Sequence, residues 1–376
     1  MSAFGVGRAD RRVSRCGRLS GILLLGLVFA AVFTQGVQAQ PFGAWMTLVG
    51  NPTNGYVRIL HSPALNPTSA FTFEAWVDIT DANAGGCSSI AGKNWQKSWW
   101  VGICGTTLRS YVNGYAPAGV GGTGTLRDKG VVPPGTWTHV AVVFNGTQRL
   151  HYINGELAGS WPESGPLTTS MDEVRIGSDI AFNKSPAGAI DEVRLWSVAR
   201  TTAQIRSTIN VRINTPQPGL IAVWPLDGTP ADIIDGHGGT VQGAGVGALS
   251  FPPSTGCGSS TVNALCLQGR FFITTKWRTN PTPGTPPDGD GHVVVAAGPS
   301  SGIFWFFSSD NWEVMVKAIN ACGLNSRYWI FSAATTNVFY RMEVTDVRGG
   351  AQKIYFNYPG PPAPAVTDTD AFATCP

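Results

Sequence analysis

Residues 135–159 read GTWTHVAVVFNGTQRLHYINGELAG, and this stretch decides the fold class. Between residues 137 and 144 the side chains on both alternating faces are largely apolar, which predicts a strand covered on both sides. An Asn-Gly pair at 145–146 is typical of a tight hairpin turn, because both residues accept a positive φ. The chain then returns through 150–153 to a second Asn-Gly pair at 154–155. The stretch therefore predicts a hairpin in the middle of a β-sandwich, without reactive chemistry of its own.

The remainder of the chain also has the composition of an all-β protein. Its 47 glycines and 26 prolines, with only 13% charged residues, fit many short strands joined by turns. Such strands recur from residue 45 to about 245, and further candidate strands follow residue 256. A Gly-, Ser- and Pro-rich stretch between them predicts a linker at 246–255. We predict an antiparallel jelly-roll sandwich at 45–245 and a second, smaller β-sandwich at 256–376.

The first 39 residues have the composition of a cleaved secretory signal peptide. Five arginines precede an apolar run that is short for a membrane span, and Val37 and Ala39 are the small residues expected before a cleavage site. Of the 26 basic and 23 acidic residues, five and one lie in this segment, which leaves 21 and 22 and a net charge of −1. This balance argues against nucleic acid or an anionic membrane surface as a partner.

Cysteine usage agrees with export. One of the seven cysteines lies in the signal segment, and an even number in an exported chain argues for disulfides. The cysteines show no C-x-x-C spacing and no neighbouring histidine cluster, so a zinc site has little support. Several pairings are open by counting, and proximity along the chain together with domain membership favours Cys87–Cys104, Cys257–Cys266 and Cys322–Cys375.

Six segments, taken in order, resemble a known family. They are FTFEAWV, SIAGK, WWVGI, the 135–159 stretch, GAIDEVRLWSVARTTAQI and GLIAVWPLDG. Together they resemble the LamG-like jelly-roll fold of the concanavalin A-like lectin/glucanase superfamily, over about 45–245. The resemblance implies two antiparallel sheets and a role mostly in binding or adhesion. Residues 256–376 resemble a cysteine-bearing β module of exported bacterial proteins that has no known activity.

Because this superfamily includes glucanases, a pair of catalytic carboxylates has to be considered. Such enzymes need two carboxyl groups about 5–9.5 Å apart, and the E-x-D-x-x-E pattern that supplies them is absent. Glu74 and Asp78 share a strand face, but at that spacing their Cα atoms lie about 13 Å apart. His139 and His151 form either a metal or base pair across the hairpin or two ordinary sheet histidines. We predict no catalytic residues, although a pair formed across strands stays open.

Aromatic residues give the clearest binding signal. Sugar rings stack on exposed aromatic faces while amides and charged groups take the hydroxyls. One short stretch beside a predicted disulfide combines these residue types, although its adjacent tryptophans must face opposite ways, so that one of them belongs to the core. The predicted ligand-binding residues are Lys93, Asn94, Trp95, Lys97, Trp99 and Trp100.

Calcium is the cofactor that the sequence suggests. The loop PLDGTPADIIDGHGG carries Asp227, Asp232 and Asp235, and oxygen-rich loops suit a hard cation. The spacing matches no defined calcium loop, so a metal site and a solvated turn are both open at this point.

Together these features predict a secreted bacterial protein that acts outside the cell or at the cell surface. We expect it to be non-catalytic and to bind a glycan or a cell-surface protein through the first domain. Two alternatives are a glycoside hydrolase of the concanavalin A-like group and a purely structural, envelope-associated module.

Overall fold

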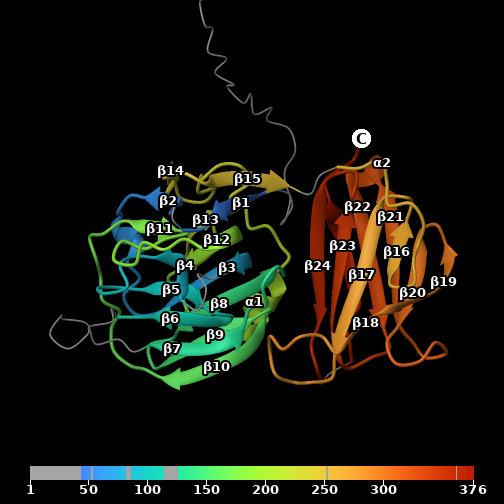
Figure 1. Ribbon diagram of the computed structural model, residues 1–376, viewed down its shortest axis with the longest axis horizontal. Helices are drawn as coiled ribbons and strands as arrows, with labels where there is room; N and C mark the ends of the chain where they lie inside the picture. The colour runs from blue at the N-terminus through green and yellow to red at the C-terminus, as the bar shows by residue number, and fades with distance from the viewer. Residues whose placement is uncertain (1–43, 52–53, 82–85, 114–125, 251–252, 361) are drawn as a thin grey trace, which may run out of the picture. The chain divides into compact units, whose positions relative to one another are not determined.

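Among the described residues, antiparallel strands form two pairs of sheets (Figure 1). The computed structural model describes residues 44–51, 54–81, 86–113, 126–250, 253–360 and 362–376. The predicted signal peptide, residues 1–39, lies outside them. No helix in these ranges is long and apolar enough to cross a membrane.

The predicted hairpin of residues 135–159 lies inside an eight-stranded sheet. Its strands follow the order β10-β9-β8-β3-β12-β1-β15, and β13 pairs with β12. β8 is bonded to β9 on one side and to β3 on the other, in a register that sets Phe144 opposite Phe71. The bounds are β1 (Ala44–Val49), β3 (Phe71–Asp81), β8 (Thr138–Phe144), β9 (Gln148–Ile153), β10 (Glu156–Pro162), β12 (Ala187–Trp196), β13 (Leu220–Trp224) and β15 (Val246–Ser250), with helix α1 at Thr202–Thr208.

β8 is covered on both faces, as its sequence predicts. All seven of its residues are buried. Val140 and Val142 belong to the main core between the sheets, whereas Ala141 and Val143 pack with Ile205 of α1. The apolar residues on both sides of this strand therefore have separate partners, which explains why the hairpin is a scaffold element.

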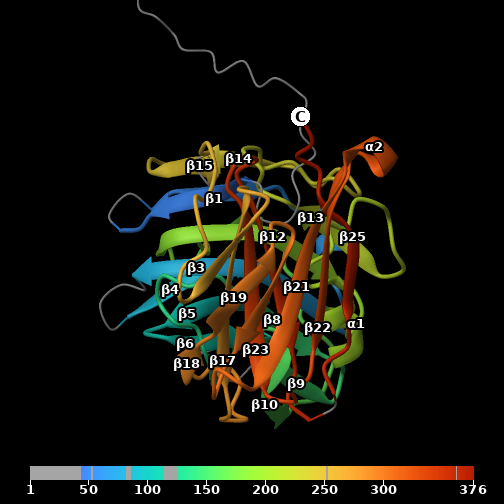
Figure 2. The same ribbon diagram turned by 90° about the vertical axis from the view of Figure 1, so that its right-hand side faces the viewer.

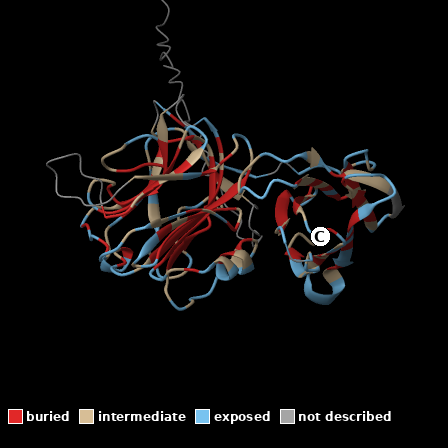
Figure 3. Cartoon of the chain, turned by 90° about the horizontal axis from the view of Figure 1, so that it is seen from below, coloured by how far each residue is buried: buried red, intermediate tan, exposed pale blue. Residues whose placement is uncertain are grey.

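A seven-stranded sheet forms the other layer of this sandwich. Its order is β14-β2-β11-β4-β5-β6-β7. Burial follows the interior between the two layers (Figure 3). The bounds are β2 (Tyr56–Ile59), β4 (Cys87–Gly92), β5 (Trp100–Cys104), β6 (Thr107–Tyr111), β7 (Arg127–Val131), β11 (Val174–Ile176) and β14 (Gly239–Gln242), with a 3-10 turn η1 at Pro63–Leu65.

The predicted linker is wrong in its first half. Residues 246–250 form β15, which pairs with β1 from Ala44 opposite Ser250 to Leu48 opposite Val246. The edge of β1 presents backbone N–H and C=O groups that need partners, and this segment supplies them despite its glycines. Composition alone does not reveal such an edge, so the exact boundary between the two predicted domains stays a proposal.

The second sandwich has its own core between two five-stranded sheets (Figure 2). One has the order β16-β17-β23-β24 with β18 beside β17, and the other β19-β20-β21-β22-β25. The bounds are β16 (Ala264–Leu267), β17 (Phe271–Arg278), β18 (Gly289–Asp290), β19 (His292–Gly298), β20 (Ser301–Trp305), β21 (Trp312–Ala321), β22 (Arg327–Ala334), β23 (Phe339–Asp346), β24 (Ala351–Asn357) and β25 (Val366–Phe372), with helix α2 at Cys322–Asn325.

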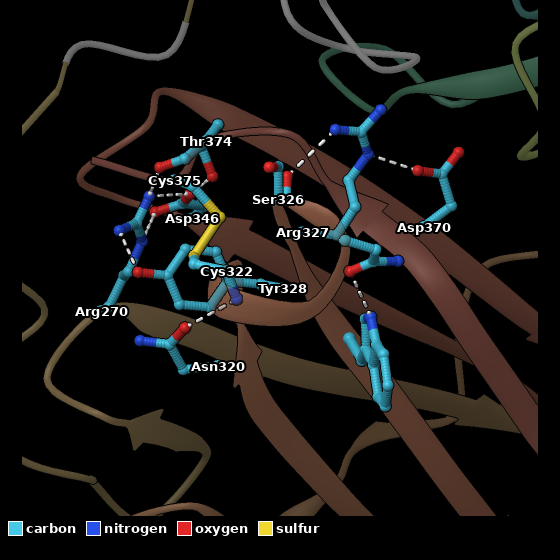
Figure 4. The surroundings of a disulfide bond; sticks show 12 residues. Arg270, Asn320, Cys322, Ser326, Arg327, Tyr328, Asp346, Asp370, Thr374 and Cys375 are labelled. Atoms are coloured by element: carbon cyan, nitrogen blue, oxygen red, sulfur yellow. Dashed lines mark hydrogen bonds and ion pairs between the residues drawn. A yellow bond between two sulfur atoms is a disulfide. The ribbon is translucent and has the colours of Figure 1, made fainter.

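All three favoured disulfides are present. Cys87 and Cys104 lie directly opposite each other on β4 and β5. The Cys322–Cys375 bond ties the start of α2 to the end of the chain (Figure 4). Beside it, the buried guanidinium of Arg270 donates from Nε and Nη2 to the two carboxylate oxygens of Asp346, each at 2.7 Å. The predicted pairing of the six cysteines is therefore confirmed.

Candidate functional site

The candidate site lies on the outer face of the seven-stranded sheet. Along β5, Val101 and Ile103 belong to the core, so Trp100 and Gly102 face outward. A Cβ atom on Gly102 would lie 2.2 Å from the Trp100 ring. The glycine therefore lets the indole lie close against the sheet. The indole Nε1 donates to the Ser89 hydroxyl at 2.8 Å, which fixes the ring.

A cavity of about 140 Å³ opens beside this indole. Its aromatic walls are in mutual contact: the Tyr111 ring centroid is 5.3 Å from that of Trp95 and 5.5 Å from that of Trp100. Phe182 meets Trp100 edge-on at 5.9 Å. Apart from the buried Trp100, the lining residues are half-buried. The lining consists of Cys87, Trp95, Trp100, Arg109, Tyr111 and Phe182.

Arg109 is the cationic member of this lining, and it is held by Asp128. Its Nε and Nη2 donate to the two carboxylate oxygens of Asp128, each at 2.6 Å. Nη1 points to the sulfur of Cys87 at 3.4 Å. The hydrogen bonds to Asp128 raise the pKa of Arg109. The cavity thus has aromatic walls and one cationic edge, the guanidinium of Arg109, which Asp128 holds in place.

Asp179 lies behind two of the walls. It is completely buried, and its carboxylate accepts backbone N–H groups from two segments of chain. Oδ2 accepts from Asn94 at 2.8 Å and from Trp95 at 3.2 Å, and Oδ1 accepts from Ala181 at 2.9 Å and from Phe182 at 3.2 Å. Burial raises the pKa of Asp179 to about 6, although the N–H donors oppose the shift.

Two of the six predicted ligand residues, Trp95 and Trp100, line the cavity. Trp99 packs in the core against Phe71 and Phe73, so the two adjacent tryptophans face opposite ways as strand alternation predicts. Trp99 is therefore a core residue and does not line the cavity.

The polar members of the predicted set lie away from the cavity. Lys93 is fully buried, with its Nζ 3.2 Å from Nδ1 of His61, and burial lowers its pKa to about 8. Asn94 and Lys97 both contact the carboxylate of Asp172, at 2.7 and 3.2 Å. These three residues therefore position the turn that carries Trp95 rather than line the cavity.

Sequence reasoning missed the other residues of the site. Arg109 and Tyr111 alternate with Leu108 in β6, and that pattern carries a signal that they share the outer face. Asp179 and Phe182 come from the segment between β11 and β12, more than 80 positions after Trp95. The pairing of β11 with β4 brings Asp179 and Phe182 beside Trp95. No local sequence pattern predicts that pairing.

The predicted calcium ligands do not converge. Asp232 uses both carboxylate oxygens to accept N–H groups from four surrounding residues at 2.9–3.1 Å. Asp227 pairs with Arg212 at 2.6 Å, and Asp235 is exposed. Within the described ranges, no three His, Cys, Asp or Glu side chains are grouped to hold a metal ion. The loop is therefore organised around the Asp232 carboxylate as an internal cap.

Of the two carboxylates considered for hydrolysis, Glu74 is held in an ion pair and Asp78 is half-buried. Glu74 is completely buried on β3, where Oε1 lies 2.5 Å from Nη1 of Arg200 and Oε2 lies 3.4 Å from Nε2 of His139. Burial alone would raise the pKa of Glu74, but His139 and Arg200 lower it to about 2. Burial raises the pKa of the half-buried Asp78. Glu74 has no access to a substrate.

The two hairpin histidines do not form a pair. His139 contacts Glu74 and the ring of Trp76. His151 instead bonds Ser110 on β6, with Nε2 2.7 Å from the hydroxyl oxygen. Burial lowers the pKa of both histidines, that of His151 to about 4. Each is an ordinary buried histidine of the sheet, and the metal or base pair is excluded.

Comparison with known proteins gives partial matches. The chain is 35% identical to pappalysin-1 of Mus musculus over 94 residues, which are 23% of this chain and 6% of pappalysin-1. A candidate carbohydrate-binding protein of Bacteroides ovatus is similar at 19% identity and a TM-score of 0.44, over 56% of this chain and 60% of that one. The CBM40 domain of the Ruminococcus gnavus IT-sialidase, bound to α2,3-sialyllactose, is similar at 15% identity and a TM-score of 0.35, over 45% of this chain and 96% of that one.

The family comparison covers the first sandwich. A sequence model described as the concanavalin A-like lectin/glucanases superfamily matches residues 51–206. These residues run from the β1–β2 connection into α1 and include the hairpin and every residue that lines the cavity. The LamG-like resemblance of the sequence is confirmed over this span: residues 51–206 match the model of the concanavalin A-like lectin/glucanases superfamily.

Proposed function

We propose that this protein binds carbohydrate, with one sugar ring held in the cavity between Trp95, Tyr111 and Phe182. The observation that carries the proposal is the composition of that cavity: four of its six lining residues are aromatic, and the charged one is a guanidinium fixed by a carboxylate. The match of residues 51–206 to the model of a superfamily named for its lectins supports the same conclusion.

The chemistry of a sugar ring matches these walls. The C–H face of a pyranose is apolar and stacks on an aromatic ring, while its hydroxyls need donors and acceptors at the edge. Trp95 and Tyr111 supply aromatic rings to the walls, and Arg109 supplies a guanidinium with N–H donors at one edge. At about 140 Å³ the cavity is smaller than the roughly 300–1,000 Å³ of pockets for drug-sized ligands, so it suits a single ring.

We further propose that binding at this site is not followed by catalysis. The carboxylates near the cavity are already engaged, because Asp128 holds Arg109 and Asp179 holds four backbone N–H groups. A glycosidase needs one carboxyl group free to donate a proton and a second to act as a nucleophile or base. The three disulfides also support export to an oxidising compartment, where the partner would be an extracellular or surface glycan.

A glycan array with the purified protein tests the proposal, followed by calorimetric titration of the best ligand. Trp95→Ala and Tyr111→Ala should each weaken binding by about tenfold, since a stacked aromatic contributes about 0.5–1.5 kcal/mol beyond its buried area. Trp312→Ala is the matched control, because this tryptophan is 55% exposed and lies on β21 of the second sandwich. Equal binding by all four proteins would contradict the site, and an array without ligands would favour the structural alternative.

A further inference from the structure

We propose that Asp179 is the positioning residue of this cavity, because its carboxylate ties the turn that carries Trp95 to the segment that carries Phe182. The inference rests on the carbohydrate-binding function proposed above. Asp179 fixes the spacing between the two aromatic walls, Trp95 and Phe182. That spacing therefore depends on whether the buried carboxyl group of Asp179 is protonated.

The geometry supports a single anchor for both walls. Trp95 lies in the turn between β4 and β5, and Phe182 lies between β11 and β12. One oxygen of Asp179 accepts the N–H of Trp95 at 3.2 Å, and the other accepts the N–H of Phe182 at 3.2 Å. Two walls from distant parts of the chain therefore share one carboxylate, and any change in that carboxylate acts on both.

A glycine at the end of β4 allows the Asp179 carboxylate to lie close to the backbone of that strand. A Cβ atom on Gly92 would lie 2.4 Å from Oδ2 of Asp179 and 2.9 Å from the ring of Trp100, so glycine is needed at the end of β4. The four N–H donors use both oxygens. An asparagine would keep one acceptor oxygen and turn an NH₂ group toward two N–H donors, which cannot accept from it.

Other titratable groups lie on the two segments that Asp179 joins or bond to those segments. At the end of β4, Lys93 bonds His61, and in the following turn Lys97 pairs with Asp172. On the Phe182 side, the Lys184 amine lies 5.7 Å from the Phe182 ring centroid. The groups to consider beside Asp179 in any pH dependence are Lys93, His61, Lys97, Asp172 and Lys184.

Protonation of Asp179 weakens the anchor in a defined pH range. Because burial raises its pKa to about 6, Asp179 takes up a proton as the pH falls through about 6. The protonated oxygen becomes a donor, so it no longer accepts from its N–H partners as a carboxylate oxygen does. A neutral hydrogen bond contributes about 0.5–1.5 kcal/mol, so we expect affinity for the sugar to fall about tenfold between pH 7.5 and 5.

The test follows Trp95 directly, with or without a sugar. The protein is labelled with 5-fluorotryptophan, the ¹⁹F resonance of Trp95 is assigned with Trp95→Phe, and its shift is recorded from pH 7.5 to 5. We expect a transition near pH 6 in the wild type, none in Asp179→Asn, and an unchanged transition in His61→Gln. His61→Gln is the control because histidine is the side chain that usually changes charge in this range.

The affinity arm uses the best ligand from the array. Asp179→Asn should bind it about tenfold more weakly at pH 7.5 and with no further loss at pH 5. A flat Trp95 resonance in the wild type, or a transition that His61→Gln removes, would overturn the role of Asp179. If no sugar binds at all, the carbohydrate proposal fails while the resonance still decides this one. If Asp179→Asn does not fold, the wild type and His61→Gln titrations give the answer.

Discussion

The buried Glu74–Arg200 pair predicts a large and specific loss of stability. Glu74 is completely buried, and Arg200, 6% exposed, donates to it at 2.5 Å. Arg200 also donates to the carbonyl oxygen of Gln204 in α1 and lies 4.2 Å from the ring centroid of Trp196. In Glu74→Gln, this guanidinium keeps its position but loses its counter-ion.

Two routes give the size of the effect. Removing one partner of a buried ion pair costs about 3–5 kcal/mol, because the other charge is left buried without compensation. Independently, lowering the pKa of Glu74 from 4.5 to about 2 corresponds to about 3 kcal/mol of stability. Since the folded-state pKa is the lower one, this contribution is complete above pH 4.5 and is lost as the pH falls toward 2.

Urea unfolding at pH 7 measures the effect. Glu74→Gln should lower the free energy of unfolding by about 3–5 kcal/mol, whereas Asp290→Asn should change it by less than about 1 kcal/mol because the Lys276–Asp290 pair is exposed. The double variant Glu74→Gln/Arg200→Met should cost less than the sum of its single variants. A change below about 0.5 kcal/mol in Glu74→Gln would refute the assignment of Glu74 as a structural ion-pair partner.

Three further predictions concern the scaffold. His151→Gln should remove about 3 kcal/mol of acid sensitivity, because the lowered pKa of His151 makes the wild type lose stability as the pH falls from 6.5 to about 4; urea unfolding at both ends of this range measures it. Replacing Cys322 and Cys375 by serine should cost about 4 kcal/mol, against about 2.5 kcal/mol for Cys257 and Cys266, because the closed segments span 53 and 9 residues; calorimetry of both variants tests the order. Gly102→Ala should cost about 1–3 kcal/mol and shift the Trp100 indole, whereas Gly298→Ala meets open space and should melt like the wild type.

The fold could be predicted because its determinants are local. Two-sided apolar alternation in 137–144 and two Asn-Gly turns specify the hairpin, and the order of the cysteines along the chain, with their division between the two predicted domains, favours one pairing. The linker prediction was wrong in its first half because the determinant of that segment is not local. Whether 246–250 forms a strand depends on the free edge of β1, some 200 residues earlier, and a Gly-rich segment gives no sign of that partner.

The site could be predicted only where one strand or turn contains it. Trp95 and Trp100 were found because they lie in one aromatic stretch, and their orientation follows from strand alternation. Phe182 and Asp179 belong to the site because β11 pairs with β4. This contact joins distant parts of the chain, so the local sequence does not predict it. For the aspartates of 227–235 the sequence left two interpretations open, because composition cannot distinguish a carboxylate that binds a cation from one that accepts backbone N–H groups, as Asp232 does.

We propose that a sugar ring occupies the cavity on the outer face of the seven-stranded sheet. The most direct measurement is a crystal structure of the protein with the saccharide that binds best on the array. We predict a pyranose ring stacked against Trp95 or Tyr111, with a hydroxyl at the guanidinium of Arg109. A ring bound elsewhere on the protein, with this cavity left without sugar, would contradict the claim.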